Sequence, residues 1–175
     1  MTTAAETEFP ARLSLSWLGW INHYFMGLTL AVLSASVLIG AASGKHLRDS
    51  SPWWIAGICA TFAIHAFVTQ RRRLAFTAYN TLDDAHENYA KVIALIERKQ
   101  WDVVANTPGS SISAKVRAKW YELTWGDLVT VVFVGSRVAI NSIGNPYAGP
   151  HGSATWKSRA KSQVQEIANA IRVVI

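Results

Sequence analysis

Three clusters of basic side chains are the residues of this sequence whose type and spacing best fit a chemical role. They are Arg71, Arg72 and Arg73; the alternating Lys115, Arg117 and Lys119; and Lys157, Arg159 and Lys161. Guanidinium and ammonium groups bind phosphate and carboxylate groups. Because the first cluster directly follows an apolar run, it suits anionic lipid headgroups better than nucleic acid. We therefore expect these residues to contact the membrane surface or an anion, with a solvated basic helix face as the simpler alternative for the last cluster.

No pattern in the sequence predicts catalysis, a metal site or a cofactor. The single cysteine, Cys59, and the five scattered histidines lack the spacing of zinc ligands. Asp127 follows Trp125-Gly126, where a turn or strand-entry role explains it. A deep polar pocket containing Asp127 or His151 would favour an enzyme. Without one, we expect a non-enzymatic protein and keep an unrecognised enzyme as an alternative.

Two long apolar stretches occupy the first part of the chain. No Asp, Glu, Lys or Arg occurs between Leu13 and Gly44 or between Ser50 and Gln70. A helix needs about 20 apolar residues to cross the hydrocarbon of a bilayer. We therefore predict a transmembrane hairpin in residues 22–73, with helices at about 22–44 and 51–70, after a leader and interfacial segment in residues 1–21. Four tryptophans flank the spans as interfacial aromatics do: Trp17, Trp20, Trp53 and Trp54.

The charges beside the spans predict their orientation. The loop between the spans is short, so both chain ends should lie on one side of the membrane. Arg12 and the Arg71–Arg73 cluster flank that side, against Lys45 and Arg48 in the loop, which favours both ends in the cytoplasm. The acidic leader and the length of the first run argue against a cleaved signal peptide.

Small residues at four-residue spacing predict close helix packing. Ser36, Gly40 and Gly44 share one face of the first span. This face could pack the hairpin against itself, or against another protein or another copy of the chain. His65 lies past the middle of the second span, and we expect it to be a neutral histidine hydrogen-bonded to the other helix.

Residues 74–175 have the composition of a small α+β domain. Helical periodicity covers 80–99, with Asn80 or Thr81 as its cap, and residues 71–79 could extend the second span as one long helix. Four strands are predicted at 101–105, 112–120, 128–134 and 137–142, and a last helix at 156–172. The order α-β-β-β-β-α predicts an antiparallel four-stranded sheet with two helices on one face.

Three short segments carry a resemblance to a known class of proteins. They are Trp101-Asp102-Val103-Val104, Trp125-Gly126-Asp127-Leu128-Val129-Thr130-Val131, and Ile140-Asn141-Ser142 before the last helix. With these segments the chain resembles small bacterial two-span membrane proteins with a C-terminal α+β domain of uncharacterised function. The resemblance implies the bacterial inner membrane as the location and transfers no activity.

These observations favour a membrane-anchored, non-enzymatic binding or scaffold protein, which could be a subunit of a membrane complex. Its partners would be membrane lipids and another membrane protein or a second copy. A domain that responds to anionic lipid or another anion at the membrane surface is the alternative. Nucleic acid is not an expected partner, because the spans and the domain core account for the eight tryptophans despite a net charge of +6.

Overall fold

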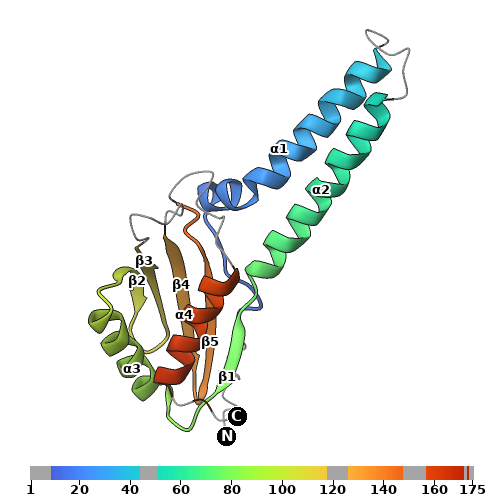
Figure 1. The fold of residues 1–175 in the computed structure, drawn as a ribbon. Coiled ribbons are helices and arrows are strands. Elements are labelled where there is room, and N and C mark those ends of the chain that lie inside the picture. The colour runs from blue at the N-terminus through green and yellow to red at the C-terminus, as the bar shows by residue number, and fades with distance from the viewer. Residues whose placement is uncertain (1–8, 44–50, 118–125, 148–156, 172, 174–175) are drawn as a thin grey trace, which may run out of the picture.

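A computed structural model describes residues 9–43, 51–117, 126–147, 157–171 and 173. Two long helices, α1 (Trp17–Ala42) and α2 (Ser51–Arg73), form a hairpin that projects from one end of a five-stranded sheet (Figure 1). Both helices are long and apolar enough to cross a membrane, and only 11% of the apolar window of each is buried inside the protein. Such continuous apolar exposure is unusual for a surface in contact with water.

The helices begin and end close to the predicted positions. Helix α1 starts at Trp17, before the expected core at residue 22, because the Ser16 side chain caps it by accepting a hydrogen bond from Gly19 N. Helix α2 ends at Arg73, so the extension of the second span through Tyr79 was wrong. A strand, β1 (Thr77–Asn80), begins only four residues later.

The described contacts of the hairpin do not involve Ser36 or Gly40. Ser34 Oγ donates to Ala56 O at 2.9 Å, and a side chain added at Gly27 would meet Phe67 and Ala63 O. Ser36 and Gly40 are exposed, and nothing within 4 Å would meet a Cβ at Gly40. The described part of this face therefore does not close the hairpin. Its use by another protein or copy stays a prediction, and Gly44 lies outside the described residues.

The sheet is antiparallel throughout and has the strand order β1-β5-β4-β3-β2. Its other strands are β2 (Asp102–Thr107), β3 (Ser111–Val116), β4 (Asp127–Val134) and β5 (Arg137–Gly144). The helices α3 (Ala85–Arg98) and α4 (Lys157–Ala170) lie on the same face of the sheet (Figure 1). The antiparallel arrangement and the two helices on one face are confirmed, but the four-strand count was wrong because it missed β1.

Strand β1 is the reason that the predicted helix at 80–99 began too early. It pairs with β5 in the register Thr77 with Ile140 and Tyr79 with Val138. The chain then turns, and Asp84 caps α3 by accepting a hydrogen bond from Glu87 N at 2.8 Å. The predicted caps, Asn80 and Thr81, instead lie at the end of β1 and after it.

The main core lies between the sheet and the two helices. Its fully buried members include Val92 of α3, Val131 of β4, Ile140 of β5 and Ile167 of α4. Burying a side chain of this size contributes roughly 1.5–3 kcal/mol. Strand β4 is covered on both faces, because Leu128, on the opposite face, is also buried in a second cluster.

The second cluster joins the hairpin to the sheet. Tyr24 of α1, Leu74, Leu128 and Ile143 are buried together there. The backbone N–H of Leu13 donates to Leu74 O at 2.9 Å. Hydrogen bonds and packing thus hold the end of α2 against the sheet.

A side chain from the sheet fastens the same junction. Asn141 of β5 donates from Nδ2 to Arg73 O at 2.8 Å and to Ala75 O at 2.7 Å. The last carbonyl groups of a helix have no partner within the helix. Asn141 supplies one of these partners and fixes where the chain leaves α2.

A basic groove as candidate functional site

A groove lies beside α4. In this region β1 extends the sheet beyond the two covering helices (Figure 1). Its volume is about 490 Å³, within the range of small-molecule sites in proteins. Three parts of the fold form it: the last turn of α2, the β1–β5 edge of the sheet, and one side of α4. The described residues that line this basic groove are Arg72, Arg73, Ala75, Thr77, Tyr79, Ile140, Asn141, Ser142, Ile143, Gly144, Ala160, Lys161, Val164 and Gln165.

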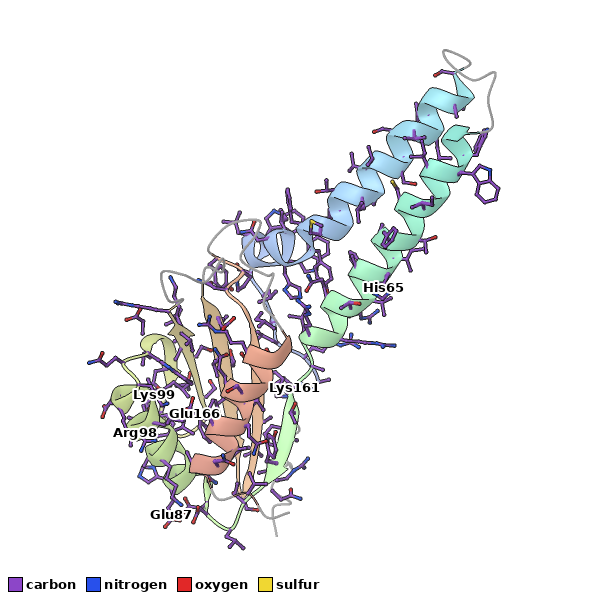
Figure 2. The ribbon with its side chains drawn as sticks, viewed as in Figure 1. His65, Glu87, Arg98, Lys99, Lys161 and Glu166 are labelled. Atoms are coloured by element: carbon purple, nitrogen blue, oxygen red, sulfur yellow. The ribbon has the colours of Figure 1, made fainter. Side chains whose placement is uncertain are left out.

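The charged side chains of the lining are all basic. Arg72 and Arg73 come from α2, and Lys161 comes from α4. Figure 2 shows Lys161 on the side of α4 toward the end of α2. None of the described lining residues is Asp or Glu, and Arg72 and Lys161 have no ion pair within the described part of the chain. The groove therefore has a positive potential with no internal counter-charge among these residues.

The remaining lining combines hydrogen-bonding and apolar side chains. Thr77, Tyr79 and Gln165 carry polar groups that can donate to an anion. Ile140, Ile143, Ala160 and Val164 supply apolar surface. Polar groups placed beside apolar surface are typical of small-ligand sites.

A buried polar network supports one wall of the groove. Ser142 Oγ donates to Gln163 Oε1 at 2.5 Å, and Gln163 Nε2 donates to Asp127 Oδ2 at 2.7 Å. Arg159 Nε lies 2.6 Å from the same carboxylate oxygen. This network fixes α4 over β5 and therefore fixes the width of the groove.

The network does not form a catalytic arrangement. Ser142 gives its hydrogen bond to an amide oxygen, which is not a base, so the hydroxyl is not activated as a nucleophile. Asp127 does not line the groove, and His151 lies outside the described residues. Among the described residues, no group of His, Cys, Asp and Glu could hold a metal ion. The groove is suited to binding.

The structure separates the basic residues that the sequence grouped together. Arg72, Arg73 and Lys161 all line the groove. Arg159 instead forms an ion pair with Asp127 and donates a hydrogen bond to Arg117 O at 3.1 Å. Arg71 is exposed beside them at the end of α2. Lys119 and the side chain of Lys157 lie outside the description.

The basic face of β3 lies away from the groove, toward the other edge of the sheet. Arg117 binds Asp102 of β2 through Nε at 2.8 Å and Nη2 at 3.0 Å, and Lys115 is half-buried nearby. The hydrogen bonds from Arg117 lower the pKa of Asp102, and the same carboxylate raises the pKa of Arg117. Arg117 thus already has an anionic partner.

The interfacial aromatics lie at the two ends of the hairpin. Trp17 stacks on Trp20 near the sheet, with ring centroids 5.9 Å apart, while Trp53 and Trp54 are exposed near the start of α2. His65 is exposed on α2 (Figure 2), so its expected hydrogen bond to the other helix is absent from the described residues. Another histidine makes that bond: His23 Nε2 lies 3.0 Å from Gln70 O.

Comparison of the chain with protein-family models, curated proteins and solved structures finds no match, including none that would support the resemblance to bacterial two-span proteins. The site must therefore be interpreted from its own chemistry. The sequence indicated Arg72 and Arg73 in one basic cluster and Lys161 in another, but it did not predict the groove that they line together, because β1 was missed. Two further basic residues, Arg117 and Arg159, have carboxylate partners that only the fold brings close.

Proposed function

We propose that this chain is a membrane-anchored, non-enzymatic binding protein whose α+β domain binds an anion in the basic groove. In this proposal α1 and α2 cross the membrane, and both ends of the chain lie in the cytoplasm of a bacterial cell, at the inner membrane. The exposed apolar surface of the two helices and the arginines at the end of α2 support this placement.

The single observation that carries the binding function is the charge of the groove. Arg72, Arg73 and Lys161 line a cavity in which no described residue is acidic. Arg72 and Lys161 have no ion pair within the described part of the chain, so their charges repel each other, and a bound anion removes that repulsion. Hydrogen bonds to charged groups contribute about 1.5–3 kcal/mol each, so two or three of them can hold a small anion.

A scaffold role is the second candidate. Ser36 and Gly40 form an exposed small-residue face on α1 that α2 does not use. Faces of this kind allow helix backbones to approach closely in lipid. Crosslinking in native membranes would support this role by trapping a second copy or a partner, and a monomeric chain without partners would exclude it.

Membrane insertion is tested first, with the full-length chain. We expect it to stay with the membrane under alkaline washing and to be released only by detergent. A chain that is soluble and monomeric without detergent would contradict the whole proposal.

Binding in the groove is tested with paired variants of the full-length chain in lipid nanodiscs. Thr77→Trp fills the groove from β1, while Ala78→Trp places the same bulk on the opposite face of that strand. Lys161→Gln removes a groove charge, while Arg98→Gln removes an equal charge from α3 (Figure 2). The probes are inorganic phosphate added to neutral phosphatidylcholine discs, and phosphatidate included in the discs.

A ligand that binds only the folded state raises the melting temperature by mass action. We expect at least one of the two phosphate sources to raise it for the wild type, Ala78→Trp and Arg98→Gln. Thr77→Trp and Lys161→Gln should show a smaller rise. If neither source stabilises the wild type, or if all five proteins respond equally, the groove does not bind anions.

A further inference from the structure

We propose that the ligand of the basic groove is the phosphate headgroup of a membrane lipid that carries at least two negative charges, as a phosphate monoester such as phosphatidate does. This inference rests on the proposed function and goes further, because it assigns the anion to the membrane. Three features of the groove lead to it: its position, its apolar wall and the number of its charges.

The position of the groove follows from the end of α2. Arg72 and Arg73 are the last two residues of the candidate span Trp53–Arg73 and line the groove as well. One residue of helix rises about 1.5 Å, so both side chains start within one turn of the point where the span ends. Long arginine side chains near span ends extend to the headgroup layer. The groove is therefore within reach of a headgroup in the adjacent leaflet.

The contacts between the end of α2 and the sheet keep the groove close to the end of the span. Asn141 lines the groove and holds both Arg73 O and Ala75 O, and Leu74 is buried in the cluster between hairpin and sheet. The domain is thus tied to α2 at the groove itself. In this proposal the junction keeps the groove beside the end of the span, within reach of headgroups in the adjacent leaflet.

The apolar wall indicates more than a bare anion. Ile140, Ile143, Ala160 and Val164 line the groove beside its polar groups. Inorganic phosphate has no apolar surface and would leave most of a cavity of about 490 Å³ to water. A lipid presents its glycerol and ester region directly beside the phosphate, and burying apolar surface contributes about 25 cal/mol per Å².

The number of charges selects the type of headgroup. Arg72 and Lys161 alone bring two positive charges that have no ion pair among the described residues, and a headgroup with one negative charge would leave one of them uncompensated. A phosphate group that carries nearly two charges and three oxygens matches them better, and arginine binds such oxygens in pairs. Zwitterionic lipids and lipids with a single net charge should therefore bind more weakly.

The test compares three kinds of nanodisc that hold the full-length protein: phosphatidylcholine alone, with phosphatidylserine, and with phosphatidate. Native mass spectrometry counts the lipids that stay bound, and the melting temperature reports their effect. We expect phosphatidate to be retained and to stabilise the protein more than phosphatidylserine. Lys161→Gln, at an exposed position that leaves folding intact, should weaken phosphatidate binding about tenfold or more, as the loss of one charge-assisted hydrogen bond does.

Thr77→Trp should prevent retention of phosphatidate without changing any charge, while Arg98→Gln and Ala78→Trp keep it. Equal retention of the two anionic lipids, or retention that both groove variants leave unchanged, would overturn the lipid assignment and indicate general surface attraction. Groove-dependent stabilisation by inorganic phosphate that matches phosphatidate would also overturn it, yet leave the proposed function standing. The absence of any groove-dependent effect with either source would overturn both.

Discussion

Asp127, fully buried at the start of β4, shares one carboxylate oxygen between Arg159 Nε at 2.6 Å and Gln163 Nε2 at 2.7 Å, both from α4. Carboxylates are almost never fully buried without a partner. The ion pair between Asp127 and Arg159 joins residues that are distant in sequence and holds α4 against the sheet. Because Gln163 also holds Ser142 of the groove wall, this ion pair determines the shape of the proposed binding site.

Removal of the guanidinium alone should destabilise the domain strongly. Arg159→Met leaves the buried carboxylate of Asp127 with one hydrogen-bond partner fewer, and breaking a buried pair from one side costs about 3–5 kcal/mol. Denaturant unfolding of the full-length chain, followed by tryptophan fluorescence, measures this loss. The double variant Asp127→Leu with Arg159→Met should recover much of it, because apolar replacement of a buried pair is often neutral. A loss in the double variant as large as in the single one would show that the pair itself stabilises the fold.

The exposed pair between Asp102 and Arg117 predicts a pH dependence at the other edge of the sheet. Its hydrogen bonds hold the pKa of Asp102 below the ordinary value of 3.8. A carboxyl group with a lowered folded-state pKa stabilises the fold above its unfolded-state pKa. This contribution is lost as the pH falls below about 3.8, through the folded-state pKa.

Asp102→Asn should therefore be slightly less stable than the wild type at neutral pH, and the difference should vanish in acid. The effect should be small because both side chains are largely exposed. Arg117→Gln should reproduce the same trend in denaturant titrations at several pH values, and the double variant should show no further loss. A difference that grows as the pH falls would contradict the ion pair.

The parts of the fold that the sequence predicted are those that local patterns determine. Every residue of a span must tolerate lipid, so a contiguous run without charges is visible without any tertiary information. The alternation of β3 and the apolar run of β4 also reflect local burial. Strand β4 lies within one residue of its predicted bounds, whereas β3 ends at Val116, so the predicted strand at 112–120 was too long at Arg117, and its last three residues lie outside the described part of the chain.

The missed parts depend on distant partners. Thr77–Asn80 is short and mostly exposed, and only its pairing with β5 makes it a strand. Strand β1 supplies Thr77 and Tyr79 to the lining of the groove, so a prediction that lacks β1 also lacks the groove. In the same way, Arg159 looked like a free cation because its partner, Asp127, lies far away in sequence. Arg72 and Lys161 could be listed as anion contacts, but their meeting could not be foreseen.

The two hydrogen bonds that Asn141 donates should stabilise the junction between the hairpin and the domain. Asn141→Leu removes both N–H donors to Arg73 O and Ala75 O, which should cost about 1–3 kcal/mol because two partly buried carbonyl groups lose their partner. Hydrogen exchange of the full-length chain in nanodiscs should show faster exchange at Leu13, whose N–H donates to Leu74 O. Asn169→Ala, on the exposed side of α4, is the control and should leave that exchange unchanged. Unchanged protection of Leu13 in the Asn141 variant would show that the N-terminal segment alone secures the junction.

Two glycines of α1 should respond differently to the same substitution. A Cβ at Gly27 would already lie 3.5 Å from the Phe67 ring and 3.6 Å from Ala63 O, whereas nothing lies within 4 Å of one at Gly40. Gly27→Leu should therefore force α1 and α2 apart, because overpacking costs about 1–3 kcal/mol, while Gly40→Leu should leave the hairpin intact. Distances between spin labels on the two helices measure the separation. If Gly40→Leu also abolishes crosslinked oligomers while the hairpin distance stays constant, the small-residue face of α1 binds a second helix. If both the hairpin distance and the crosslinking pattern are unchanged, that face contacts only lipid and the scaffold role loses its support.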